Sequence, residues 1–174
     1  DFRHFSGLGW ASLGVLELTA LPTIGAERWI PWVREADVLL VDGGDATYLC
    51  HWMRESGLAD LLPSLRDTVW VGVSAGSMVM TPRIGSDFVA WAAAPDDRTL
   101  GIVDFAIFPH LDVFPTNTLE AAERWAAGLG SPAFAIHVTP GEVRGPRGQR
   151  SQRQLEVREV PLRRAHGPVV AQQN

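Results

Sequence analysis

The sequence predicts an α/β fold in which helices cover both faces of a mostly parallel sheet. Short apolar runs typical of buried strands alternate with segments that have a helical pattern. Such alternation is typical of parallel sheets, whose strands are joined by helical crossovers. The chain has 174 residues, of which 46% are hydrophobic, and this length suits one domain with a three-layer core. We therefore expect a single domain over residues 1–174.

Each expected element rests on its own local pattern. The expected helices lie at 26–35, 47–56, 58–66 and 119–128, with a further apolar, helix-compatible segment at 77–80. The expected strands lie at 15–18, 36–41, 69–73, 105–108 and 133–137. Pro31 fits a helix best in the first turn, and Asp45 is the expected N-cap of the helix that follows it. The polar segment 86–98 predicts a loop or a short hairpin.

Charge is distributed unevenly along the chain, whose net charge is −5 and whose 15 basic residues are all Arg. From 141 to 174, seven Arg accompany three Glu, a balance of +4, whereas residues 1–140 carry eight Arg and 17 acidic residues, a balance of −9. So acidic a body argues against a nucleic-acid partner, because phosphate contacts need clustered cations. We expect 141–174 to be an Arg, Gly and Pro-rich, solvated tail with one edge strand at 155–160.

Composition also bounds the location and the cofactors. No uninterrupted apolar run approaches the roughly 18 residues of a membrane-spanning helix, and no signal-peptide pattern is found, so we expect no membrane partner. The single cysteine, Cys50, excludes an internal disulfide, suits a reducing cytoplasm and is expected in the core. No His, Cys, Asp or Glu spacing matches a metal site, and no phosphate-loop or dinucleotide fingerprint is present. We expect neither a metal nor another cofactor.

The most informative stretch is Gly-x-Ser-x-Gly at 72–76, which follows the apolar strand 69–73 and leads into the segment 77–80. A sharp turn from strand to helix needs small neighbours, because a larger side chain would collide with the strand or the helix. Such a turn exposes the hydroxyl of Ser74 at the carboxyl end of the strand, above the amide of Ala75. The pattern therefore predicts a nucleophile elbow, although a buried serine in a tight turn has the same sequence.

Two further strands end in residues that suit the same chemistry. Ligands of open parallel sheets collect at the carboxyl ends of the strands. Gly43 and Gly44 follow strand 36–41 and can offer backbone amides to an oxyanion, and His110 follows strand 105–108. A serine hydroxyl needs a neighbouring base, and the unperturbed pKa of histidine suits that role at neutral pH. Of the five histidines His110 is the best placed, since it lies at a strand exit.

Three segments, VDGGDATYLCHW, VWVGVSAGSMV and GIVDFAIFPHLD, together resemble the dipeptidase E and cyanophycinase family of serine peptidases. The likeness covers residues 38–137, with the segments in the family's order. It implies the three-layer α/β/α, flavodoxin-like fold of class I glutamine amidotransferases. It also implies that Ser74 is the nucleophile, that His110 is the general base, and that the amides of Ala75 and of Gly43 or Gly44 form the oxyanion hole.

The implied function is hydrolysis of short peptides through an acyl-enzyme on Ser74. Aspartyl dipeptides are the best-known substrates of the family, and a site for them would need a cation, for which Arg83 and Arg98 are candidates. The family places an acidic residue after the next core strand, where this chain has Val138. Asp112 and Glu142 are the possible substitutes for that third catalytic residue.

Two alternatives and one structural expectation accompany this interpretation. Because Val138 stands in place of an acid, the chain could instead be a degenerate member that binds a peptide or a partner without cleaving it. The serine motif alone also fits an esterase of the α/β-hydrolase type, with His137 or His166 as the base. The family has a further strand before the part that matches Asp1. We therefore expect a missing N-terminal strand and an uncovered sheet edge, which would suit a homodimer.

Overall fold

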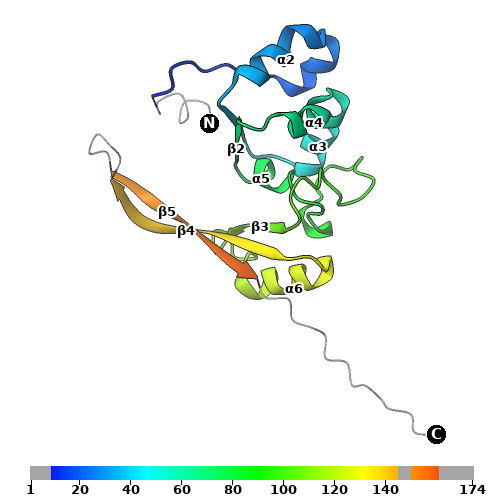
Figure 1. Cartoon of the computed structure of the whole chain (residues 1–174). Coiled ribbons are helices and arrows are strands. Elements are labelled where there is room, and N and C mark those ends of the chain that lie inside the picture. The colour runs from blue at the N-terminus through cyan, green and yellow to red at the C-terminus, as the bar shows by residue number, and fades with distance from the viewer. Residues whose placement is uncertain (1–8, 145–149, 161–174) are drawn as a thin grey trace, which may run out of the picture.

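The computed structural model describes residues 9–144 and 150–160, in which helices and strands alternate (Figure 1). The strands are β1 Val38–Val41, β2 Val69–Gly72, β3 Ala106–Leu111, β4 Ala133–Arg144 and β5 Arg150–Val160. The α-helices are α2 Ala26–Glu35, α3 Ala46–Glu55, α4 Leu58–Leu61, α5 Ala75–Met78 and α6 Leu119–Leu129. Short 3-10 helices are η1 Leu18–Thr23, η2 Leu62–Ser64 and η3 Ser86–Phe88.

The first half of the chain is built on a parallel pair of strands. β1 and β2 are in register from Val38 opposite Val69 to Val41 opposite Gly72. The helices α2, α3 and α4 pack against this pair around a shared apolar core (Figure 1). The buried members of this core are Leu21, Trp29, Val33, Cys50, Met53, Leu58, Leu61 and Val79.

The second half is built on a separate three-stranded sheet in the order β3-β4-β5. β3 and β4 are parallel, whereas β4 and β5 form an antiparallel pair whose far part projects away from the body (Figure 1). Helix α6 covers this sheet, and its core includes Phe108, Trp125 and Ala126. Within the described residues, no backbone ladder joins this sheet to the β1–β2 pair.

The strand before Ser74 is less covered than the sequence predicts. The apolar pattern of residues 69–73 predicts a strand that is buried on both faces, but Val69, Val71 and Val73 are 57%, 39% and 37% exposed. Their neighbours Trp70 and Gly72 are half-buried. Successive side chains of a strand point to opposite faces, so this alternation means that described residues cover only one face of β2.

Three other expectations need correction. Residues 15–18 do not form a strand: Val15 is exposed and η1 begins at Leu18. The helix expected at 58–66 divides into α4 and η2, because Pro63 lacks the amide that an α-helix would need. The strand expected to stop at 108 continues to Leu111, and Pro109 is tolerated because the ladder with β4 shifts register there.

Helices α2 and α3 lie close to their expected places, whereas the last two strands are longer than expected. Helix α2 has the expected bounds, although Pro31 lies in its middle and not in its first turn. Asp45 caps α3 by accepting a hydrogen bond from the amide of Tyr48, as expected. β4 continues through 141–144, and β5 begins at Arg150, so both strands extend into the segment expected as a tail.

Candidate active site

Ser74 occupies the tight turn between β2 and α5. Its backbone has φ 53° and ψ −112°, a conformation that non-glycine residues rarely adopt. A Cβ atom on Gly76 would overlap the carbonyl oxygen of Val41, and one on Gly72 would overlap the backbone of Gly76. The hydroxyl of Ser77 donates to the carbonyl oxygen of Gly72 at 2.7 Å. Small residues on both sides of Ser74 therefore permit the turn, and a hydrogen bond across it holds the turn in place.

His110 approaches Ser74 from the other sheet. Its Nε2 atom lies 2.8 Å from the Ser74 hydroxyl oxygen, although the two residues are 36 positions apart. The imidazole is half-buried, and the backbone of His110 has φ 56°. The distance is within hydrogen-bond range for a base and the hydroxyl that it would deprotonate. The structure thus brings these two predicted residues together.

A tight turn after Pro109 fixes the direction of the imidazole. Asp112 also has a positive φ, 59°, and its amide donates to the carbonyl oxygen of Asn117 at 2.8 Å. The side-chain amide of Asn117 in turn donates to the carbonyl oxygen of Pro109 at 3.1 Å. The ring of Phe114 lies edge-on to that of His110, with centroids 5.6 Å apart. Three non-glycine residues in strained conformations, Ser74, His110 and Asp112, therefore gather at one place in the fold.

The backbone places the two candidate acids differently. Among residues whose side chains the structure describes, none is paired with Nδ1 of His110, and Asp112, two residues beyond it, is exposed. Leu111 is in register with His137 on β4, and Glu142 lies five residues farther along that strand. At about 3.3 Å per residue, this puts the backbone of Glu142 roughly 16 Å past the level of Leu111. Register alone therefore does not bring Glu142 to His110.

The loop after β1 lies directly beside Ser74. A Cβ atom on Gly43 would lie 3.4 Å from the Cβ of Ser74. The amide of Gly43 donates to its neighbour Asp42 at 2.8 Å. Gly44 has φ 138°, and neither its amide nor that of Ala75 has an acceptor among the described residues. Of the expected donors, Gly44 and Ala75 are therefore available to a ligand, whereas Gly43 is already engaged.

Asp45 ties this loop to a segment 45 residues away. One carboxylate oxygen accepts from the Thr47 hydroxyl and the Tyr48 amide, and the other accepts from the amides of Ala90 and Trp91 at 3.0 and 2.7 Å. Partial burial opposes ionisation, but these hydrogen bonds outweigh it, so the pKa of Asp45 lies below its usual value. The sequence identifies Asp45 as a helix cap, but nothing local signals its second pair of donors.

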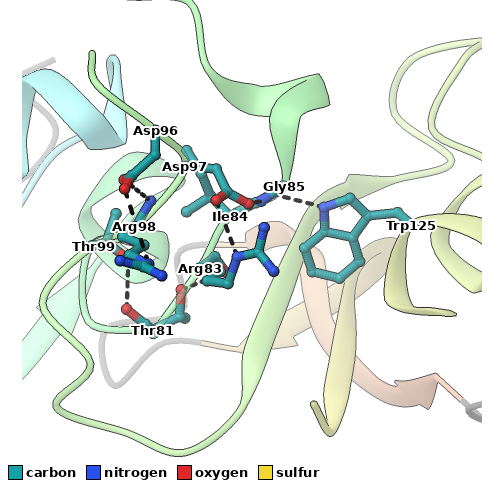
Figure 2. Close-up of polar contacts among 9 residues, drawn as sticks. All are labelled: Thr81, Arg83, Ile84, Gly85, Asp96, Asp97, Arg98, Thr99 and Trp125. Carbon is teal, nitrogen blue, oxygen red and sulfur yellow. Dashed lines mark hydrogen bonds and ion pairs between the residues drawn. The ribbon is translucent and has the colours of Figure 1, made fainter. Parts of the chain in front are cut away.

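The segment 83–99, which includes Ala90 and Trp91, is braced by ion pairs (Figure 2). Arg83 Nε lies 3.0 Å from one oxygen of Asp97, and the other oxygen accepts from the amide of Gly85 at 3.1 Å. Arg98 pairs more loosely with Asp96, at 3.9 Å. Both arginines that were candidates for binding an acidic substrate are therefore paired with carboxylates of their own segment.

The same segment also connects the two halves. Trp125 of α6 donates from its indole nitrogen to the carbonyl oxygen of Ile84 at 2.7 Å (Figure 2). A Cβ atom on Gly85, whose φ is 78°, would overlap the Trp125 ring. Phe88 packs edge-on against Phe108 and Trp125. Helix α6 and the segment beside Ser74 are thus packed together with no room for a larger side chain.

Several other predicted features have definite positions in the structure. Cys50 is buried in the first core, and that burial raises the pKa of its thiol. No helix in the described ranges is both long and apolar enough to cross a membrane. Over the same ranges, no three or more His, Cys, Asp or Glu side chains are grouped as metal ligands would be. His166 lies outside the described residues.

Three comparisons with known proteins bear on this site. The model of peptidase family S51 matches residues 3–131, about three quarters of the chain. The fold is similar to the crystal structure of a Listeria monocytogenes EGD-e protein that is provisionally named a peptidase E. That likeness has a TM-score of 0.55 and 18% sequence identity, over 81% of this chain and 68% of the other. The search of curated proteins gave no match. The predicted α/β, flavodoxin-like fold is confirmed.

Proposed function

The chain belongs to peptidase family S51 and is a serine-type peptidase, and we propose that it hydrolyses short peptides through an acyl-enzyme on Ser74. The observation that carries the proposal is the 2.8 Å contact between the Ser74 hydroxyl and Nε2 of His110. Family membership assigns the class of chemistry, and this contact supports Ser74 and His110 as the nucleophile and the base. The substrate and the roles of individual residues are the proposed part.

In the proposed reaction, Ser74 forms a bond to the carbonyl carbon of the peptide while His110 takes the hydroxyl proton. The carbonyl oxygen becomes an oxyanion and receives hydrogen bonds from the amides of Ala75 and Gly44, for which the described part of the chain offers no acceptor. The carbon–nitrogen bond then breaks, and His110 gives the proton to the departing amine. Water, deprotonated by His110, attacks the ester, releases the acid product and restores Ser74.

Orientation of His110 by its surroundings supports its proposed role as the base. The turn at Asp112 and the edge-on ring of Phe114 restrict the imidazole, which is one of the tasks that a triad acid performs. Asp112 and Glu142 both stay in the proposal as candidate third members. Asp112→Asn and Glu142→Gln separate them, because only the change at the participating acid should lower kcat.

The test uses purified protein, a panel of dipeptides and tripeptides, and Ser74→Ala beside a matched control. The control is Ser86→Ala, since Ser86 is an exposed serine outside the turn. We expect hydrolysis to vanish in Ser74→Ala and to be unchanged in Ser86→Ala. Hydrolysis that survives in Ser74→Ala would contradict the proposal.

A second candidate function is peptide binding without cleavage. It is favoured by one observation: among residues whose side chains the structure describes, none accepts a hydrogen bond from Nδ1 of His110. A serine-reactive phosphonate separates the two functions. Labelling of Ser74 in the folded protein supports the peptidase, whereas a folded protein that binds peptides but stays unlabelled supports the binding module.

Two further parts of the proposal concern location and assembly. We propose a cytoplasmic location, which is supported by the single, buried and free thiol of Cys50. The homodimer expected from an uncovered sheet edge stays a prediction, which the mass of the protein in solution tests.

A further inference from the structure

Four aromatic rings form a cluster on the side of α3 that faces the segment 83–99, beginning in the first turn of the helix, just after the Gly43–Gly44 loop. Tyr48, His51 and Trp52 come from α3, and Trp91 comes from the segment 83–99. The Trp91 ring lies 5.5 Å from that of Tyr48 and 5.0 Å from that of His51, measured between centroids. Tyr48 is 40% exposed, and the other three are half-buried. The cluster therefore presents aromatic surface to solvent.

Two sets of contacts place this cluster near Ser74. The amide of Trp91 donates to Asp45, and Asp45 immediately follows Gly44, one of the two available amide donors. Just before Trp91, Val89 packs on a small core that contains Ala46 and Ala75, and Ala75 directly follows Ser74. The segment that holds Trp91 thus passes beside the turn at Ser74 and is then hydrogen-bonded to Asp45, at the end of the Gly43–Gly44 loop.

The direction of α3 turns the aromatic surface toward the same edge of the sheet. Helical side chains lean toward the N-terminus of their helix. The N-terminus of α3 lies at Asp45, just past the carboxyl end of β1. Tyr48, in the first turn, therefore leans toward the edge where Ser74 and Gly44 lie.

The charges around this surface disfavour an acidic side chain. Asp45 is a carboxylate with a lowered pKa, so it is negatively charged at neutral pH. Arg83 and Arg98 are each paired with a carboxylate of their own segment. An apolar ring, in contrast, carries no charge for Asp45 to repel, and it gains contact with the aromatic rings.

We propose that Tyr48 and Trp91 form the subsite for the residue that supplies the scissile carbonyl, and that this subsite prefers a large apolar or aromatic side chain to an acidic one. The carbonyl oxygen of that residue would lie at the Gly44 amide. Its side chain is therefore the part of the peptide nearest the loop that leads to Tyr48. The inference rests on the proposed function, because it takes Ser74 and Gly44 as the reacting end of the site.

The kinetic test compares Phe-Ala, Ala-Ala and Asp-Ala as substrates, with Ala-Phe as the reversed control. We expect kcat/KM for Phe-Ala to exceed that for Ala-Ala by about tenfold or more, and Asp-Ala to be the poorest. Trp91→Ala should reduce the ratio of Phe-Ala to Ala-Ala about tenfold, and Trp91→Phe should restore most of it. Trp32→Ala, which changes a 68% exposed tryptophan on α2, should leave all rates unchanged. Preference for Asp-Ala, or an unchanged ratio in Trp91→Ala, would overturn the subsite.

A binding measurement separates failure of the subsite from failure of the peptidase. Calorimetry on Ser74→Ala with the same dipeptides needs no cleavage. One outcome is that the wild type cleaves none of the dipeptides, while Ser74→Ala binds Phe-Ala at least tenfold more tightly than Asp-Ala and Ser74→Ala/Trp91→Ala does not. In that case the subsite stands and the proposed function fails. If the wild type cleaves peptides through Ser74 with no such preference, the proposed function stands and the subsite fails.

Discussion

The two halves of this molecule contribute to the site in different ways. The first half supplies Ser74, Gly44 and Ala75 from short local motifs, in which small residues permit close turns. The second half supplies His110 from a strand that passes through a proline, shifts its register and turns with positive φ. The first contribution is encoded within a few residues, whereas the second depends on packing between distant segments.

This difference determines which interactions hold each of the two catalytic residues in position. The turn at Ser74 is held by its own neighbours, including the Ser77 hydroxyl. The position of His110 relative to Ser74 depends on how the second sheet and α6 pack on the segment 83–99, for example through Trp125 and Ile84. Changes in the first half should therefore act on the turn itself, and changes in the second half should act on the docking of one half on the other.

The largest expected effect tests whether the halves act as one unit. Ser74→Ala and His110→Ala should each lower kcat by about 10⁴-fold or more, because a nucleophile and its base fail together. The double variant should be little worse than either single variant. Single-turnover kinetics on the best dipeptide measures all three. Losses that multiply in the double variant would mean that the two residues act independently.

The next effect contrasts one substitution in the two halves. Gly76→Ala puts a Cβ atom onto the carbonyl oxygen of Val41 and should lower the free energy of unfolding by about 3 kcal/mol. Gly128→Ala lies in α6 with open space around it and should raise that free energy by about 0.5–1 kcal/mol. Urea denaturation measures both. A mild effect of Gly76→Ala would mean that the turn at Ser74 can relax.

A smaller effect probes the contact between the halves. Trp125→Phe removes the indole donor and leaves the carbonyl oxygen of Ile84 without it, which should cost about 1–3 kcal/mol. Trp32→Phe, at an exposed position, should change stability by less than about 0.5 kcal/mol. Thermal unfolding followed by circular dichroism compares the two. Equal melting temperatures for both variants would show that the indole hydrogen bond does not hold the halves together.

The smallest expected effect is a change in the stability of the fold that appears only at acidic pH. The pKa of Asp45 is lowered in the folded state, so its ionisation stabilises the fold fully above the usual value of 3.8 and loses that effect as pH falls through the folded value. Asp45→Asn should therefore flatten the loss of stability below about pH 4. Urea midpoints between pH 2.5 and 7 measure it, with Asp87→Asn as the control because Asp87 is exposed in the segment 83–99, which holds the Ala90 and Trp91 amides that Asp45 binds. Parallel curves for wild type and Asp45→Asn would remove Asp45 as a cause.

What the sequence predicts well is what adjacent residues decide. The turn at Ser74 follows from Gly72 and Gly76, the start of α3 from Asp45, and the bounds of α2 from its own pattern. The pattern also brought His110 into consideration, because residues at strand ends meet at one edge of a sheet.

What the sequence does not predict depends on partners far along the chain. The exposure of Val71 reflects a face of β2 that no described element covers, which its apolar pattern cannot reveal. The second oxygen of Asp45 binds amides 45 residues away, and Arg83 pairs with Asp97 14 residues away. Nothing in the local pattern around either residue distinguishes these partners from other candidates.

The separation of the two sheets has a consequence for behaviour on warming. Within the described ranges the sheets share no backbone ladder, yet the Ser74–His110 hydrogen bond spans them. Slight loosening of one sheet against the other would lengthen that bond while both sheets keep their own hydrogen bonds. Activity should therefore be lost at a temperature several degrees below the melting temperature of the chain. Cooling should restore that activity, because neither sheet has unfolded.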